Sequence, residues 1–279
     1  MPVEHFENLI EQYCQIGGGA LGIGSQQSDF LSDSLLLDRL ECLEKNREKL
    51  WIYSTTPLIS AAKYSDEELQ RILKLFSYLE ISVAGYDSDS YKEMVGVEAF
   101  GVLYSQLKRV ERIVREKNIE IEIELSFRTN NKEKFMASPF FKEISNLFTT
   151  RTFKDHFFSW FGSIKQEELP LGATLVKQFN NDMIVDCDKP SSTLAVMPNG
   201  NVVGCGCIDW LQQYVIGNTY INTITEIWTS KKAKEFRHSF SNRKELPSIC
   251  YECALYSPCV FRDKRYITYH SSKGLWYKY

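Results

Sequence analysis

The stretches "CDKPSSTLAVMPNGNVVGCGC" (187–207) and "CYECALYSPC" (250–259) decide how the C-terminal part of this chain folds. Together they hold six of the eight cysteines among 279 residues. In the first stretch, two short β segments flank Asn199-Gly200, a pair that tolerates the positive φ of a tight hairpin turn. The sequence therefore predicts a small domain in which a hairpin and a second turn both carry thiols.

Four of these thiols have the spacing of a metal site. Cys187 and Cys205 flank the hairpin, and Cys250 and Cys253 form a C-x-x-C turn. Four soft thiolates suit either tetrahedral zinc or an iron-sulfur cluster, and the spacing does not choose between them. On spacing alone we favour structural zinc. The alternative is that these cysteines are small buried hydrophobic residues.

The composition excludes several classes of protein. The 33 basic residues nearly balance the 36 acidic ones, so no broad positive field attracts nucleic acid or anionic lipid. No stretch approaches the roughly 20 apolar residues that a membrane span needs, and the N-terminus does not resemble a signal peptide. We expect a cytoplasmic protein with a small-molecule or peptide partner. In that reducing compartment, paired cysteines are metal ligands or catalytic thiols more often than disulfides.

The upstream part alternates helical and strand patterns at the spacing of βα units, which predicts an α/β fold around a parallel sheet. Ser65, with Glu68 three residues later, is a capping box that marks one helix start. We place a domain boundary near residue 170, giving domains at 1–170 and 171–279. We expect helices at 2–13, 34–46, 65–76, 99–117 and 223–240, and strands at 20–24 (short and buried), 50–54, 78–85 and 119–127.

The last of these strands alternates isoleucine or leucine with Glu120, Glu122 and Glu124, so one of its faces is polar. Two interpretations are open. In a partly open barrel the polar face lines the interior and touches substrate, whereas on an edge strand it is simply solvated. We favour the solvated edge strand.

The order of the C-terminal features resembles the SPASM/twitch extension of radical S-adenosylmethionine enzymes. The matching features are Cys187, Gly200 and Cys205, then "VIGNTYINTITEIWTSKKAKEFR", then "CYEC". The resemblance implies that Cys187, Cys205, Cys250 and Cys253 hold an auxiliary [4Fe-4S] cluster. Cys207 and Cys259 are alternative ligands, and the form of the domain with one cluster fits best.

The upstream part is similar to the barrel of the same enzymes. The resemblance places Asp29 where an acidic residue receives the amino group of S-adenosylmethionine, although Gln27 and Ser28 stand at positions where the family has glycines. It makes Thr55, Thr56 and Ser82 neighbours of this cosubstrate and lets Arg128 pair with its carboxylate. Each of these residues also has a simpler interpretation: Asp29 as a helix-start residue, Thr55, Thr56 and Ser82 as caps or turns, and Arg128 as a surface ion pair.

The family's reaction uses a C-x-x-x-C-x-x-C loop after the first barrel strand, and this sequence has no such triplet. We therefore expect a partial (β/α) barrel that lacks its first strand, with an upstream segment lost. In intact form the resemblance implies a second [4Fe-4S] cluster, a reductant such as flavodoxin or ferredoxin, and cleavage of S-adenosylmethionine with hydrogen abstraction from a peptide, sugar or other small substrate. The alternative is a non-catalytic binding or scaffold protein stabilised by zinc or a cluster.

Overall fold

The structure is a computed structural model in which most of the chain can be described. Cys207, Cys259 and Gln27 lie outside the described residues. The described residues are 1–24, 28–148, 150–154, 156–159, 163–176, 187–206, 209–239, 247–251, 253, 267–269 and 275–277.

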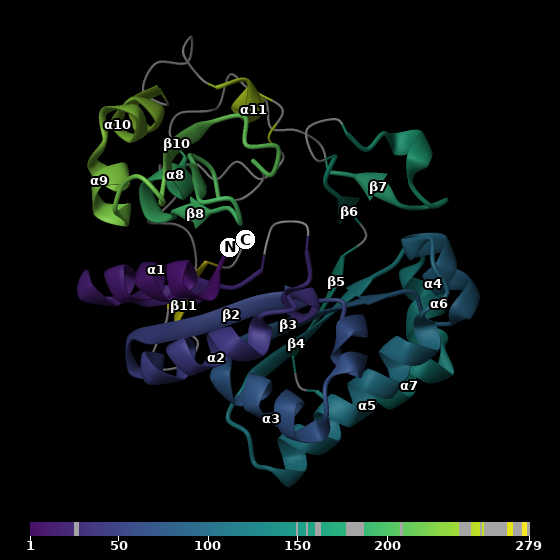
Figure 1. Ribbon diagram of the computed structural model, residues 1–279. Coiled ribbons are helices and arrows are strands. Elements are labelled where there is room, and N and C mark those ends of the chain that lie inside the picture. The colour runs from purple at the N-terminus through teal and green to yellow at the C-terminus, as the bar shows by residue number, and fades with distance from the viewer. Residues whose placement is uncertain are drawn as a thin grey trace.

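A five-stranded parallel sheet forms the centre of the N-terminal part, with the strands in the order of the sequence (Figure 1). Each strand is joined to the next through at least one helix, as in βα units. The strands are β1 (Gly19–Gly22), β2 (Leu50–Thr56), β3 (Tyr78–Ala84), β4 (Glu122–Arg128) and β5 (Thr150–Lys154).

The helices of this part begin at residues that can cap them. Ser65 accepts the backbone N–H of Glu68, and the Glu68 carboxylate accepts the N–H of Ser65, so the expected capping box is confirmed. The α-helices are α1 (Val3–Gln15), α2 (Leu36–Lys45), α3 (Asp66–Leu75), α4 (Ser88–Val95), α5 (Phe100–Glu116), α6 (Lys132–Ala137) and α7 (Pro139–Ile144), and the 3-10 helices are η1 (Phe30–Ser32), η2 (Arg47–Lys49) and η3 (Ile59–Lys63).

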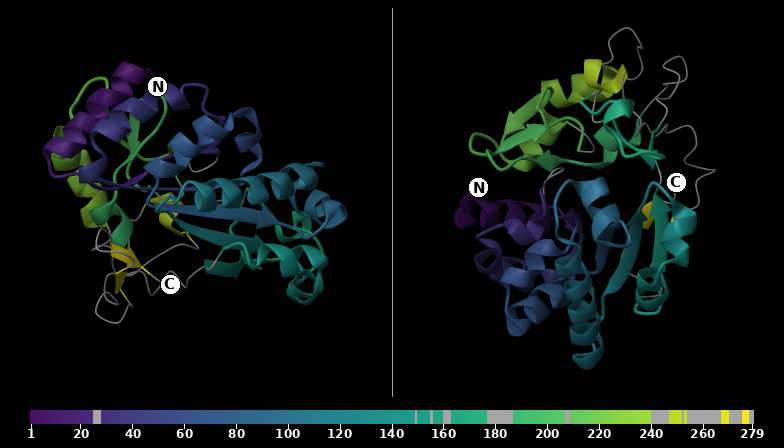
Figure 2. Two further views of the ribbon diagram at one scale, coloured as in Figure 1. Left: turned by 90° about the horizontal axis from the view of Figure 1, so that it is seen from below. Right: turned by 90° about the vertical axis from the view of Figure 1, so that its right-hand side faces the viewer.

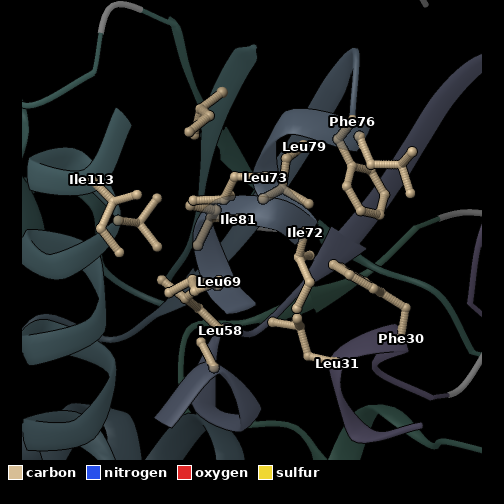
Figure 3. Packing of buried hydrophobic residues seen from close by; sticks show 14 of the residues in the cluster. Phe30, Leu31, Leu58, Leu69, Ile72, Leu73, Phe76, Leu79, Ile81 and Ile113 are labelled. Carbon is tan, nitrogen blue, oxygen red and sulfur yellow. The ribbon is translucent and has the colours of Figure 1, made fainter. Parts of the chain in front are cut away.

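The main hydrophobic core lies between the sheet and the helices α2, α3 and α5 on one of its faces (Figure 1). Leu69, Ile72 and Leu73 of α3 recur at helical spacing and are almost fully buried. They pack near Leu79 and Ile81, which point to the same face of β3 (Figure 3). This alternation leaves the opposite face of the sheet, which we call the inner face, to polar side chains.

Two expectations about the sheet are wrong. The strand expected at 20–24 is present as β1, but it is mostly exposed rather than buried, because it pairs only with β2 among the described strands. The strand with alternating glutamates is not an edge strand, since β4 lies between β3 and β5. Its polar face is therefore part of the inner face.

The C-terminal part contains a three-stranded antiparallel sheet, β10-β9-β8, covered by short helices (Figure 2). The β8–β9 hairpin forms, but Asn199 does not have positive φ, and only Gly200 does, at 81°. The backbone N–H of Gly200 donates to the carbonyl of Met197, so Pro198 occupies the second turn position, where its fixed φ suits it. The elements are α8 (Asp188–Ser192), β8 (Ala195–Val196), β9 (Asn201–Val203), β10 (Val215–Asn218), α9 (Ile224–Thr229), α10 (Lys231–His238) and α11 (Ser248–Tyr251).

The single helix expected at 223–240 is two helices. Ser230 has extended backbone angles, and its side chain accepts the N–H of Ala233, so it ends α9 and caps α10. Strand β6 lies before residue 170 and pairs with β7, which lies after it. This pairing does not define where one domain ends, so the domain boundary expected near residue 170 stays a prediction. The remaining elements are β6 (His156–Phe157), η4 (Gln166–Glu168), β7 (Thr174–Leu175), β11 (Ile267–Tyr269) and β12 (Leu275–Tyr277).

The expected fold class is confirmed, because a parallel sheet with helices is followed by a small α+β domain that contains cysteines. Among the described residues, no helix combines the length and the apolar character needed to cross a bilayer.

Candidate functional site

The structure brings four cysteines from three segments together in the C-terminal domain. Cys187 directly precedes α8, Cys205 follows β9, Cys250 lies on α11, and Cys253 follows that helix. Cys187 and Cys205 are buried within the small hydrophobic cluster of the domain, and Cys250 and Cys253 pack against it. The C-x-x-C segment is a tight turn, since the N–H of Cys253 donates to the carbonyl of Cys250 at 3.4 Å.

The thiols are close enough to influence one another electrostatically. The pKa of Cys250 is strongly raised, first by burial and then by the neighbouring thiols of Cys205, Cys253 and Cys187. A thiolate is disfavoured in such a group unless a cation compensates its charge. Four soft sulfur donors in an apolar setting fit zinc or an iron-sulfur cluster chemically.

Convergence of the thiols does not by itself assign them as ligands. Within the part of the chain that the structure describes, no three or more His, Cys, Asp or Glu side chains are arranged as a metal site. The ligand role of the four cysteines therefore stays a prediction. The alternatives Cys207 and Cys259 lie outside the described residues.

A buried carboxylate shapes the loop after Cys205. Asp209 is fully buried and accepts the backbone N–H groups of Gln213 at 2.7 Å and Tyr214 at 2.9 Å. Burial raises the pKa of the Asp209 carboxyl, and this carboxyl also contributes to the raised pKa of Cys250. The ring of Tyr214 packs on Phe236 with centroids 4.4 Å apart. The sequence analysis did not identify Asp209, because a single aspartate in a loop carries no spacing signal.

Helix α1 contacts this C-terminal domain with its polar face. His5 Nε2 lies 2.8 Å from Thr219 Oγ1, and the His5 ring stacks on Tyr220 with centroids 3.8 Å apart. Two turns further along the helix, Gln12 Oε1 accepts the backbone N–H of Ile224 at 2.9 Å. The two parts of the molecule are thus joined by side chains at helical spacing.

The expected cosubstrate residues at the first two strand ends form one pair. Thr56 Oγ1 donates to Asp29 Oδ1 at 2.8 Å, and the same carboxylate oxygen accepts the N–H of Leu31 at the start of η1. Asp29 is thus a helix-start residue, as the simpler interpretation proposed. Its other oxygen, Oδ2, is buried without a hydrogen-bond partner, so it remains able to accept a donor from a ligand. Thr55 is exposed and points to the inner face.

The other two expected residues form a second pair on the inner face. Arg128 Nε donates to Ser82 Oγ at 2.5 Å, and its Nη2 lies 3.8 Å from Glu80 Oε1. Lys154 Nζ contacts the same Glu80 oxygen at 2.7 Å. Arg128 therefore takes part in an ion-pair network that it shares with Lys154, and about a third of its side chain is exposed.

The sequence did not reveal that the polar residues of β3 and β4 lie side by side on the inner face. The alternation of β4 places Glu124, Ser126 and Arg128 on one face, and the same alternation on β3 places Tyr78, Glu80 and Ser82 beside them. The signal was present in the glutamate pattern, which we had assigned to an edge strand.

Comparisons with known proteins agree with this architecture. Residues 187–254 match the SPASM family, described as an iron-sulfur cluster-binding domain. None of the curated proteins compared with the chain matches it.

Several solved structures share the fold. The structure of anSMEcpe with bound AdoMet and Cp18Cys peptide has a TM-score of 0.54 and 14% identity, over 91% of this chain and 78% of that one. BtrN in complex with AdoMet and 2-DOIA has a TM-score of 0.50 and 16% identity, over 88% and 76%. Streptococcus suis SuiB bound to S-adenosylmethionine has a TM-score of 0.58 and 14% identity, over 91% and 64%.

At such identities the likeness shows the fold alone. The resemblance stated from the sequence is therefore confirmed for the C-terminal domain and for the architecture of the barrel.

Proposed function

We propose that this chain is a radical S-adenosylmethionine enzyme of the SPASM type, or the larger part of one. The observation that carries the proposal is the gathering of Cys187, Cys205, Cys250 and Cys253 inside the matched domain. This domain accompanies a half-barrel, the name used here for strands β1 to β5 with their helices. In intact form such an enzyme cleaves S-adenosylmethionine and abstracts hydrogen from a peptide, sugar or other small substrate.

The four cysteines would hold the auxiliary [4Fe-4S] cluster, which supplies an acceptor for one electron or an anchor for substrate when it is bound. The reducing cluster of this chemistry requires a C-x-x-x-C-x-x-C segment, which these 279 residues do not contain. A flavodoxin or ferredoxin would serve as reductant.

Residues of the half-barrel would bind S-adenosylmethionine by its charged ends. The unpartnered Oδ2 of Asp29 can accept a hydrogen bond from the ammonium group. The forked donors of Arg128, held by Ser82, suit the carboxylate. Thr56 fixes the orientation of the Asp29 carboxylate, since its hydroxyl occupies Oδ1.

Anaerobic reconstitution with iron and sulfide tests the cluster. We expect about four irons and four sulfides per chain in the wild type, and loss of most of both in Cys205→Ser and Cys253→Ser. Cys14→Ser is the matched control, because Cys14 is buried on α1 in the other part of the molecule. Zinc that displaces iron at equal loading, or unchanged iron in the two variants, would contradict the cluster.

Calorimetric titration of the cluster-loaded chain with S-adenosylmethionine tests the half-barrel. We expect Asp29→Asn to weaken binding about tenfold or more, because a charge-assisted hydrogen bond is lost. Asparagine still caps η1, so the local fold is kept. Asp38→Asn, on the exposed face of α2, is the control. A loaded chain that shows no binding would favour the metal-stabilised binding protein instead.

A further inference from the structure

Polar side chains of β3, β4 and β5 are neighbours on the inner face of the sheet. Strand register places Ser126 between Ser82 on β3 and Thr152 on β5, and Glu124 next to Glu80. These positions alternate with Leu79, Ile81 and Leu125 of the main core, so they lie on the inner face. A row of three hydroxyls across these strands therefore lies beside a row that contains the two carboxylates.

The two carboxylates of this group differ in charge balance. Glu80 is neutralised by Lys154 at 2.7 Å, with Arg128 at 3.8 Å. Glu124 accepts two neutral hydroxyls instead, from Tyr78 and Thr152, each at 2.7 Å. Among the described residues no cation pairs with Glu124. A carboxylate offers about four acceptor positions, so two stay open.

A second observation points to a ligand at the same place. Ser126 is fully buried, and its Oγ has no hydrogen-bond partner. It lies two residues from Glu124 on the same face of β4. A buried hydroxyl without a partner costs free energy in the folded protein. A polar ligand that reached Glu124 would lie next to this hydroxyl and could satisfy it.

Aromatic rings flank the open carboxylate. Trp51 lies with its ring centroid 5.3 Å from Tyr53 and 6.3 Å from Tyr78, and all three point to the inner face. Tyr78 also donates to Glu124, so the rings and the carboxylate are adjacent. Aromatic faces beside a carboxylate attract cations more than neutral groups.

We propose that Glu124, Ser126 and the rings of Trp51 and Tyr78 bind the protonated amine of a small substrate. This inference rests on the proposed function, since it names the substrate class of the same half-barrel. A neutral hydroxyl would leave the charge of Glu124 without a counterion, whereas an ammonium compensates it and donates to both open acceptors and to Ser126.

Glucosamine and glucose are suitable probes, because they differ by an ammonium in place of one hydroxyl. Binding to the cluster-loaded chain is measured by ligand-observed NMR titration at mildly acidic pH. We expect glucosamine to bind at least about tenfold more tightly than glucose, and Glu124→Gln to remove most of that difference, as loss of one charge-assisted hydrogen bond implies. Glu120→Gln, an exposed residue just before β4, is the matched control.

Ser126→Ala provides an independent variant if Glu124→Gln folds poorly. We expect it to keep or raise the urea midpoint, because it removes an unsatisfied hydroxyl, and to weaken glucosamine binding about threefold to tenfold. Equal binding of the two probes, or a preference that survives both variants, overturns the inference. Iron content and S-adenosylmethionine binding are measured on the same samples. If the chain holds no iron or binds no S-adenosylmethionine but still prefers glucosamine, the amine site is supported and the proposed radical enzyme is contradicted.

Discussion

The half-barrel and the cysteine domain reach stability by different routes. In the described residues, the hydrophobic cluster of the half-barrel has 34 buried apolar side chains, whereas the cluster of the cysteine domain has seven, of which two are cysteines. A cluster of seven is small for holding three strands and four short helices by apolar burial alone. We therefore expect the thiols of the second region, through a bound metal or cluster, to take over part of the structural task that leucine and phenylalanine perform in the first.

The largest effect should come from removing a thiol of the cysteine domain. Cys205→Ala is expected to destabilise this domain by several kcal/mol, because metal-site binding energy is also folding energy. Hydrogen exchange should then accelerate in β9 and β10 and stay slow in β3 and β4. Unchanged protection of β9 after loss of iron would show that the two regions do not differ in this way.

A truncation in the half-barrel core should have a smaller but still large effect. Leu107 of α5 is fully buried, so Leu107→Ala is expected to cost about 2–5 kcal/mol in the free energy of unfolding by urea. Val102→Ala, at an exposed position of the same helix, should cost less than about 0.5 kcal/mol. Similar values for the two variants would mean that the core is not the source of stability.

The half-barrel also uses a cysteine as an apolar residue, which predicts a dependence on alkaline pH. Burial raises the pKa of Cys42 from 9.0 to about 11. Because the folded-state pKa is the higher one, the contribution of the neutral thiol is complete below pH 9.0 and declines as pH rises toward about 11. The loss should reach about 2–3 kcal/mol.

Urea midpoints across this range measure the decline, and Cys42→Ala should flatten it even though its midpoint at neutral pH is lower. Burial also raises the pKa of Tyr64, from 10.0 to about 12, so part of the slope should persist at higher pH in the variant. An identical slope in wild type and variant would exclude Cys42 as its source.

The hairpin of the cysteine domain should show the smallest of these effects. Gly200 has φ of 81°, and a Cβ there would lie 2.4 Å from the Tyr220 ring. Gly200→Ala is expected to cost about 1–2 kcal/mol through the left-handed conformation alone. Gly101→Ala, on α5 with open space around it, should instead stabilise the half-barrel by up to about 1 kcal/mol. Thermal unfolding of both variants checks the contrast.

The sequence predicted the half-barrel well, since periodic apolar residues and capping pairs act locally. Ser65 and Glu68 are three residues apart, and their hydrogen bonds need no information from elsewhere in the chain. The turn at Gly200 was only partly predicted, because Pro198 imposes a longer turn than the Asn-Gly pair suggests. The break at Ser230 was missed, since a serine inside an apolar helical pattern can either continue the helix or cap a new one.

The site was less predictable, because it depends on which strands are neighbours. Alternation in β4 shows that one face is polar, but not whether that face is solvated or enclosed. Ser82 and Arg128 were each expected near the cosubstrate by resemblance, whereas Glu124, Ser126 and Tyr78 become neighbours only through the register of β3 with β4. Asp29 caps η1 through one oxygen, and its other oxygen has no hydrogen-bond partner, so its contact with the cosubstrate stays a prediction.

The contact between His5 and Thr219 spans 214 positions of the chain, which has a consequence for synthesis on the ribosome. At about 5–20 residues per second, roughly 10–40 seconds separate the emergence of the two residues. During that interval the polar side of α1 faces water, while its apolar side can already pack on α2. Docking of the last-made domain onto the first-made helix thus closes assembly, and a ribosome-arrested series of nascent chains would show the His5 ring becoming protected only at the end.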